Sequence, residues 1–308
     1  MLSIAATFVS LIALLASAQG PGGGRGTLPA PLVRDNATEK ISEHVYVIPD
    51  NNVVLVPNIG IIVGSRATLV VDTGMGTRNG QTVMREVEKV SKNADLYLVT
   101  THIHPEHDLG AAAFPPHTKV IRAQAQVTEI SETGLDLAKR FSGFSPMNAE
   151  LLAGAEFRKA DITFDREHTV DLGGVRARLI AMGNNHTRGD TAIFIEPDGV
   201  LFSGDVTMPG LPAIAADASI RLWLTSQQRL AALRPKRVVP SHGAIGDASM
   251  IANYKTFFDT IMRRVAELKK QGKSADEAAS TIQGELKQRF GDSPRIAAAV
   301  RTAYVQTQ

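Results

Sequence analysis

The 308-residue sequence contains no cysteine, few aromatic residues and almost no net charge. Without cysteine, the protein cannot form disulfide bonds, ligate a metal through thiolates or carry a lipid on a cysteine. Its 33 basic and 31 acidic residues leave a formal net charge of +2, which favours neither nucleic acid nor an anionic membrane as a partner. The sequence also shows no basic patch with interleaved aromatic residues, and this argues against a nuclease.

Hydrophobic residues are abundant, and the first of them form a run at the N-terminus. They make up 44% of the sequence, enough for a sizeable core in one large domain or two small ones. Residues 2–18 are apolar and uncharged, and they end in the small-x-small pattern Ala16-Ser17-Ala18 that signal peptidase cleaves. We therefore expect residues 1–18 to be a signal peptide and the protein to be periplasmic or secreted.

The alternative for this run is an uncleaved membrane anchor. No Lys or Arg precedes the apolar residues, which is a departure from the usual signal peptide. A run of 17 apolar residues is nevertheless at the short limit for spanning a bilayer. We expect cleavage before Gln19 and no stable membrane association afterwards.

The rest of the sequence divides into a leader, a region of mixed β and α patterns and a helical end. Residues 19–40 begin with a segment dense in Gly and Pro, which predicts a flexible leader. Residues 41–248 predict the main domain, and residues 249–308 predict a helical extension of that domain. Helices are expected at 249–271, behind the capping box Ser274-Ala275-Asp276-Glu277, and from about Ser293.

Short β-type runs and helical patterns alternate within the main domain. Helices are predicted at residues 79–91 and 221–233, and residues 123–160 are expected to be helical and irregular. Strands are predicted at residues 44–48, 53–56, 60–63, 68–71, 95–101, 175–182, 190–196, 200–203 and 236–241, with a hairpin signal at 169–174.

Residues of the types that bind metals follow the ends of several of these runs. Loops at one edge of a sheet can converge in space while the strands hold them rigid, as a site with several ligands requires. The residues are His102, His104, Glu106 and His107 after one run, His186 after another, Asp205 after a third and His242 after a fourth.

The segment HIHPEH could by itself contribute to two metal sites. Alternation in an extended chain would place His102 and His104 on one side. Pro105 would then bend the chain, so that Glu106 and His107 turn toward a second position.

Together these segments resemble the metallo-β-lactamase superfamily. THIHPEHDLG resembles the H-x-H-x-D-H signature of that family, and NNHTRGDTAIFI, LFSGD and VVPSHG match its later ligand motifs in order. Upstream, TLVVDTG resembles its early strand and turn. The similarity covers about residues 41–245, and five motifs in sequence are far more specific than a lone H-x-H. The resemblance implies an α/β fold, the four-layer αββα sandwich, here with a C-terminal helical extension.

The resemblance also implies a pair of metal ions. Imidazole nitrogens suit zinc and carboxylates offset its charge, so we expect two Zn²⁺ per chain. Asp205 and Glu106 are also the predicted catalytic residues, and Asp72 and Asp190 are expected to orient ligand imidazoles or brace the loops. The first ion would take His102, His104 and His186, and the second would take Glu106, His107 and His242, with Asp205 bridging the two.

Glu106 departs from the family pattern, which has Asp at that position. A glutamate reaches further by one methylene and is held less firmly, so iron or manganese is an alternative to zinc at the second site. Asp108, two residues on, could also help to bind the metal, although its place in the motif favours contacts with other ligand-loop groups or solvent.

The function implied is an exported metal-dependent hydrolase acting on a small-molecule substrate. A metal-bound hydroxide would attack an ester, lactone, thioester or amide bond, including a β-lactam. Asp205 argues against the β-lactamase groups that have Cys or Ser there, and resembles the bridging aspartate of glyoxalase II-like and lactonase-like members. The alternatives are a mononuclear iron oxidoreductase of the persulfide-dioxygenase type and a binding protein that kept the metal but lost catalysis.

Overall fold

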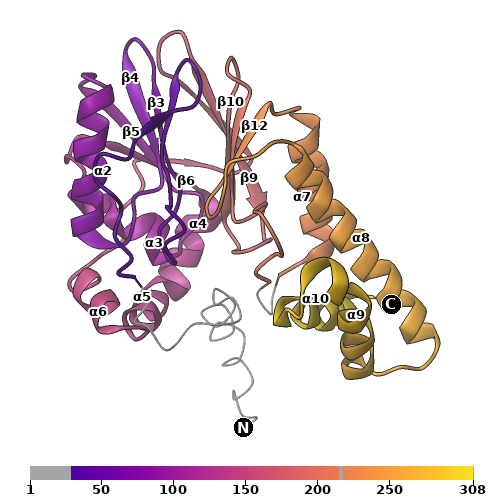
Figure 1. The fold of residues 1–308 in the computed structure, drawn as a ribbon. Coiled ribbons are helices and arrows are strands. Elements are labelled where there is room, and N and C mark those ends of the chain that lie inside the picture. The colour runs from indigo at the N-terminus through magenta and orange to yellow at the C-terminus, as the bar shows by residue number, and fades with distance from the viewer. Residues whose placement is uncertain (1–28, 215–217, 308) are drawn as a thin grey trace.

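Two β-sheets form the centre of the protein (Figure 1). The computed structural model describes residues 29–214 and 218–307, so the expected signal peptide and the start of the leader lie outside the described residues. The first sheet has seven strands in sequence order. They are β1 (Glu39–Lys40), β2 (Val45–Ile48), β3 (Ile59–Val63), β4 (Ala67–Val71), β5 (Asp95–Val99), β6 (Lys119–Ala123) and β7 (Ile162–Phe164).

The second sheet has five strands in reverse sequence order. It is antiparallel except where β11 and β12 pair in parallel, whereas β4 to β7 of the first sheet are parallel throughout. Its strands are β8 (Glu167–Asp171), β9 (Arg176–Gly183), β10 (Asp190–Ile195), β11 (Val200–Gly204) and β12 (Arg237–Pro240).

Helices cover the outer faces of both sheets and give the expected four-layer αββα sandwich. Helix α2 lies outside the first sheet, α7 and α8 lie outside the second, and α9 and α10 extend beyond its lower end (Figure 1). The elements of the first half are α2 (Gly76–Val90), α3 (Pro105–Asp108), the 3₁₀ helix η1 (Leu109–Ala113), α4 (Gln124–Glu129), the π-helix η2 (Ile130–Gly134), α5 (Leu135–Ser142) and α6 (Pro146–Leu151). Those of the second half are α7 (Ile220–Ala232), α8 (Ser249–Lys270), α9 (Ala275–Phe290) and α10 (Pro294–Gln306).

Strand β4 shows why the hydrophobic runs are continuous rather than alternating. Leu69 and Val71 belong to one apolar cluster together with residues of the second sheet, whereas Val70 belongs to another together with Val83 and Val87 of α2. Successive side chains point to opposite faces of a strand, and both faces of β4 are covered. Each fully buried Val or Leu contributes about 1.5–3 kcal/mol to this packing.

The prediction of a strand at residues 53–56 was wrong. The chain turns there, with positive φ angles of 51° at Asn51, 57° at Asn52 and 63° at Leu55, and a strand does not accommodate such angles. Asparagine is a residue that favours turns, and here it outweighs the β preference of the valines that follow. Strands β1, β6 and β7 were not predicted.

The ends of the described chain pack onto the sandwich. Val33, within the predicted leader, is buried, and its N–H donates to Oδ1 of Asn79 in α2 at 2.8 Å. At the other end, Ser274 and Glu277 form the expected capping box, with reciprocal side-chain to backbone hydrogen bonds at the start of α9. Among the residues the structure describes, none of the helices has the length and hydropathy needed to cross a membrane.

Candidate metal centre

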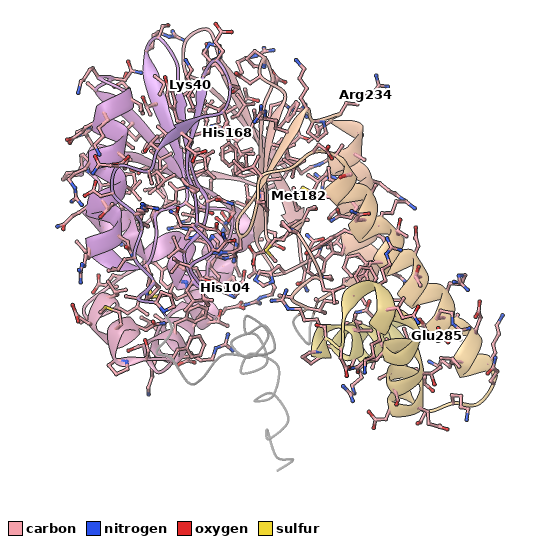
Figure 2. All side chains as sticks on the ribbon, in the orientation of Figure 1. Lys40, His104, His168, Met182, Arg234 and Glu285 are labelled. Atoms are coloured by element: carbon pink, nitrogen blue, oxygen red, sulfur yellow. The ribbon has the colours of Figure 1, made fainter. Side chains whose placement is uncertain are left out.

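All seven expected ligands lie at one edge of the sandwich. Strand β5 leads into the segment with His102, and the parallel strands β11 and β12 end just before Asp205 and His242. The connection between β9 and β10 supplies His186. Figure 2 shows His104 at the lower edge of the two sheets, with His168 further up.

The short helix α3 arranges the central motif. Pro105 occupies its first turn, where the missing N–H costs nothing, and the N–H groups of His107 and Asp108 donate to the carbonyl oxygen of His104. The backbone is therefore extended at His104 and helical after it. The rings of His102 and His107 nevertheless lie close together, with their centres 4.0 Å apart, and His107 also belongs to a group with Glu106 and His242.

Three groups of side chains are close enough to share a metal ion. Within each group the candidate ligand atoms all lie within 4.8 Å of one another. Asp205 also lies near the first group, because its Oδ2 is 3.3 Å from Nε2 of His186. The groups are His102, His104 and His186, then His102, His107 and Asp205, then Glu106, His107 and His242.

Unpartnered polar atoms inside this cluster fit a metal-binding role. Nε2 of His102, Nε2 of His107, Oε2 of Glu106 and Oδ1 of Asp205 are buried and have no hydrogen-bond partner among the described residues. Leaving buried polar atoms unpaired costs about 1–3 kcal/mol each, and native proteins seldom tolerate four at one place. Bound metal ions would satisfy these atoms, and imidazole nitrogens and carboxylate oxygens are donors that Zn²⁺ accepts.

Carbonyl acceptors behind two of the imidazoles fix how these rings are oriented. Nδ1 of His186 donates to the carbonyl of Ala213 at 2.8 Å, and Nδ1 of His242 donates to that of Val56 at 2.9 Å. Since a carbonyl can only accept, the proton is on Nδ1 and Nε2 carries the lone pair. This is the arrangement of metal-ligating histidines in general.

Asp72 and Asp190 occupy the supporting positions expected from the sequence. Oδ2 of Asp72 lies 2.9 Å from Nδ1 of His107, and its other oxygen accepts from the N–H of Thr101 at 2.7 Å. Asp190 accepts from the N–H groups of His186 at 2.6 Å and Thr187 at 3.0 Å. Asp72 thus orients an imidazole, and Asp190 holds the backbone of a ligand loop.

Burial and neighbouring charges shift the pKa values of the cluster in different directions. Burial and the other histidines hold the pKa values of His102 and His104 well below the ordinary value, so both are neutral at pH 7. For His107, burial acts downward, but Asp72 and Glu106 outweigh it and raise the pKa to about 9. A metal ion would therefore have to displace a proton from His107.

The pKa values of the two carboxylates in the cluster, Asp205 and Glu106, shift in opposite directions. Burial raises the pKa of Asp205, but the surrounding histidines, His186 first, outweigh it and lower the pKa to about 2. Burial raises the pKa of Glu106. Asp205 thus stays ionised across the physiological range.

The structure places Asp108 in a buried ion pair that the sequence analysis missed. Its carboxylate faces the guanidinium of Arg122 in β6, with Nη2 2.8 Å from Oδ1 and a second contact between Nη1 and Oδ2. Thr100 donates to the same carboxylate at 2.9 Å. Asp108 therefore anchors α3 to the first sheet, and a single arginine in a segment with no predicted element carried no signal of this.

A cavity of about 320 Å³ opens beside the cluster. His104 and His186 form part of its wall, and Leu137 and Arg140 of α5 form another part. A cavity next to convergent polar groups is the usual place for a small-molecule substrate.

Comparison with known proteins agrees with this geometry. The sequence model described as the metallo-beta-lactamase superfamily matches residues 52–242. The chain belongs to this superfamily. Its ligand motifs, its sandwich fold and its structural neighbours all agree with that assignment.

A curated relative of this chain is a linear primary-alkylsulfatase from Pseudomonas sp. (strain ATCC 19151). It is 27% identical over 208 residues, which are 57% of this chain and 39% of the alkylsulfatase. The chain thus spans about two fifths of the length of the curated relative that it matches.

Solved structures share the fold at lower identity. The sec-alkylsulfatase Pisa1 from Pseudomonas sp. has a TM-score of 0.69 at 14% identity, covering 88% of this chain and 50% of that one. A metallo-beta-lactamase from Pontibacter korlensis has a TM-score of 0.57 at 20% identity, covering 72% of this chain and 98% of that one. Sulfatase and β-lactamase neighbours in one superfamily support a hydrolase.

Proposed function

We propose that the protein is a zinc-dependent hydrolase that cleaves an ester-type bond in a small substrate. The observation that carries this proposal is the set of four buried ligand atoms without hydrogen-bond partners among the described residues. A hydrolase needs metal and substrate side by side, and the cavity wall contains His104 and His186, which form one of the three ligand groups together with His102.

The groups of side chains support two ions rather than one. His102, His104 and His186 would hold the first ion, and Glu106, His107 and His242 the second. Asp205 lies within reach of both groups and would bridge them. The longer side chain of Glu106 still reaches His107 and His242, which supports its role as a ligand despite the departure from the family pattern.

Bound there, the ions would lower the pKa of a water molecule and polarise the bond to be cleaved. The chain's own groups supply orientation and charge. Carbonyl acceptors hold the imidazoles of His186 and His242 with Nε2 toward the site, and Asp205 keeps its negative charge because its pKa is lowered to about 2. Glu106 and Asp205 are therefore the carboxylates that we assign to catalysis.

Sulfate esters join the carboxylic esters, lactones, thioesters and amides as candidate substrates. The support is the similarity to a protein named as an alkylsulfatase, over 57% of this chain. Sulfur and carbonyl centres share the requirement for an activated water and a stabilised leaving oxygen, so one pair of ions could serve either.

The mononuclear iron oxidoreductase is the weaker proposal. It needs only one group of ligands, whereas Glu106, His107 and His242 form a further group beside His102, His104 and His186. One iron per chain and oxygen consumption would favour it over hydrolysis.

The test of the hydrolase is a panel of sulfate ester, carboxylic ester, lactone, thioester and β-lactam substrates with zinc-loaded protein. Asp205→Asn should lower kcat at least about a hundredfold for any substrate that is cleaved. Asp259→Asn, an exposed carboxylate of α8 paired with Lys255, is the matched control and should leave kcat unchanged. Equal activity of wild type and Asp205→Asn would contradict the proposal.

We also propose that the protein is exported, with residues 1–18 removed. The support is the apolar run and the pattern Ala16-Ser17-Ala18. N-terminal sequencing of protein from a periplasmic fraction should begin at Gln19, and an intact N-terminus in the cytoplasmic fraction would contradict export.

A further inference from the structure

We propose that the cavity beside His104 and His186 binds an anionic group of the substrate through Arg140. The inference rests on the proposed function, since it specifies the substrate class of the same site. It adds the requirement that the substrate carries a negative charge, which the metal ligands do not impose. It also gives α5 a role in substrate specificity.

Arg140 is placed at the cavity by its surroundings. It lies in the last turn of α5, exposed to solvent and at the cavity wall. Its Cζ lies 6.0 Å from the centre of the Phe141 ring, and that buried ring lies 5.3 Å from the ring of His104. The ring of Phe141 therefore contacts both the guanidinium of Arg140 and the candidate metal ligand His104.

The charge of Arg140 is available to a ligand. Within residues 29–214 and 218–307, its guanidinium takes part in no ion pair and no hydrogen bond, and its one contact of note is the aromatic face of Phe141. An arginine at a cavity wall offers paired donors that match a carboxylate or sulfonate group.

The second arginine of the cavity is already engaged. Nη1 of Arg188 lies 2.6 Å from Glu132, and its Nε lies 3.8 Å from Glu129. Glu129 also accepts from the N–H groups of Arg188 and Gly189. These carboxylates offset Arg188, so Arg140 is the cation that we assign to the substrate.

Asp136 is the acidic group that opposes such binding. It lies one turn before Arg140 in α5, also at the cavity wall. An anion held by Arg140 would feel its repulsion. Removing this carboxylate should therefore change binding in the opposite direction to removing Arg140.

Apolar groups of the same wall leave room for a short hydrocarbon part. Ile103 and Leu137 line the cavity together with the polar groups. A volume of about 320 Å³ is at the small end of ligand pockets. The ligand class is thus a small organic anion with an apolar portion, its charge supplied by a sulfate or by a carboxylate.

The test is calorimetric titration of the zinc-loaded protein with octanesulfonate, octanoate and 1-octanol, none of which the proposed reaction can cleave. Arg140→Gln should weaken binding of the two anions about tenfold and leave 1-octanol unchanged. Arg140→Lys should retain most of the affinity, and Asp136→Asn should tighten anion binding. The tighter of the two anions identifies whether sulfate or carboxylate is the preferred group.

Lys139→Gln is the matched control, because it removes the same charge from an adjacent exposed position that is not part of the cavity wall. Equal weakening by Lys139→Gln and Arg140→Gln, or equal affinity of wild type for octanesulfonate and 1-octanol, would overturn the inference. Anion binding that depends on Arg140 in a protein that hydrolyses no ester would instead refute only the proposed function.

An independent observation concerns the C-terminal helices: the geometry points to Arg295 of α10 as a positioning residue for His186. Nη1 of Arg295 donates to the carbonyl of Leu211 at 2.7 Å, and two residues further on the carbonyl of Ala213 accepts from Nδ1 of His186 at 2.8 Å. The extension thus holds the backbone that sets the orientation of a candidate ligand.

Further contacts attach α8 and α10 to the connection between β11 and α7. Gln306 bonds the carbonyl of Ala218 at 2.7 Å and the N–H of Ile220 at 3.0 Å. Leu211 belongs to the same buried apolar cluster as Tyr254 of α8 and residues of α10. Packing and hydrogen bonds therefore act together on the chain that follows Asp205.

Three variants test this role. Arg295→Ala should lower zinc affinity about tenfold and shift the imidazole ¹⁵N resonances of His186 in metal-free protein, because the backbone that holds the Ala213 carbonyl against Nδ1 loses its anchor at Leu211. Arg295→Lys should recover most of both effects. Arg301→Ala is the control on the same helix, since Arg301 is exposed and pairs only with Asp276 among the described residues.

A merely structural role would give a different pattern. Arg295→Ala would then lower the unfolding midpoint while the His186 resonances and the zinc affinity of the folded protein stayed unchanged, and this would overturn the inference. If Arg295→Ala does not fold, Gln306→Ala, which removes the neighbouring contacts, should produce the same shift of the His186 resonances. An unshifted spectrum of that variant would also overturn it.

Discussion

Replacing Arg122 by methionine should destabilise the protein strongly, because it would leave Asp108 buried without its cationic partner. The two side chains are 1% and 0% exposed. In the variant the carboxylate would keep only the hydroxyl of Thr100, at 2.9 Å, of its side-chain partners. Methionine fills a similar volume, so the lost charge is the main change.

The expected magnitude follows from that burial. Removing one partner of a buried ion pair costs about 3–5 kcal/mol, since the remaining charge has lost both its counterion and its water. Replacing both partners by apolar groups is often neutral. The double variant Arg122→Met, Asp108→Leu should therefore recover most of the stability that Arg122→Met loses.

The assay is urea unfolding in the presence of a chelator, so that metal binding does not contribute to the measured stability. Arg66→Met is the matched control, because Arg66 lies 2.8 Å from Asp171 with the two side chains 65% and 59% exposed. Exposed pairs of this kind contribute about 0–1 kcal/mol. Similar losses in Arg122→Met and Arg66→Met, or no recovery in the double variant, would refute the reasoning.

Two further predictions concern glycines and a helix cap. Gly284→Ala should stabilise the protein by about 0.5–1 kcal/mol, because nothing lies within 4 Å of the added methyl group in α9. Gly80→Ala in α2 should destabilise it, because the methyl carbon would lie 2.0 Å from the carbonyl oxygen of Gly110. A lower unfolding midpoint for Gly284→Ala would contradict the first prediction, and an unchanged or higher one for Gly80→Ala would contradict the second. The backbone N–H of Ser274 lowers the pKa of the Glu277 carboxyl from 4.5 to about 2. Since the folded-state pKa is lowered, this stabilisation is complete above about pH 5 and disappears as the pH falls toward 2. A carbon NMR titration should show the low pKa, and a midpoint near the ordinary value would show that the cap does not form.

The sequence predicted those parts of the site in which a residue type that binds metals directly follows a hydrophobic run. His102, His186, Asp205 and His242 each follow a hydrophobic run, and such runs became strands or strand ends in the structure. The order of these motifs then implied their convergence. The orienting role of Asp72 follows from the same strand ends, since it lies directly after β4, beside β5.

The parts that the sequence did not predict depend on contacts between distant segments. Arg122 meets Asp108 across 14 positions, and Arg295 meets Leu211 across 84. A single arginine has no periodicity or motif, so its partner appears only when the sheets and helices are assembled. Arg140 is similar, because its importance depends on a cavity that several elements form together.

The most direct test of the central claim is the metal content of protein purified without added metal, measured per chain for wild type and for Glu106→Asp. If the seven side chains hold two metal ions, wild type should contain two zinc ions per chain. Glu106→Asp should also contain two, because its shorter side chain matches the family pattern. One iron in both would favour the oxidoreductase. No bound metal in either protein would contradict the account, because the buried atoms of His102, His107, Glu106 and Asp205 would then need another explanation.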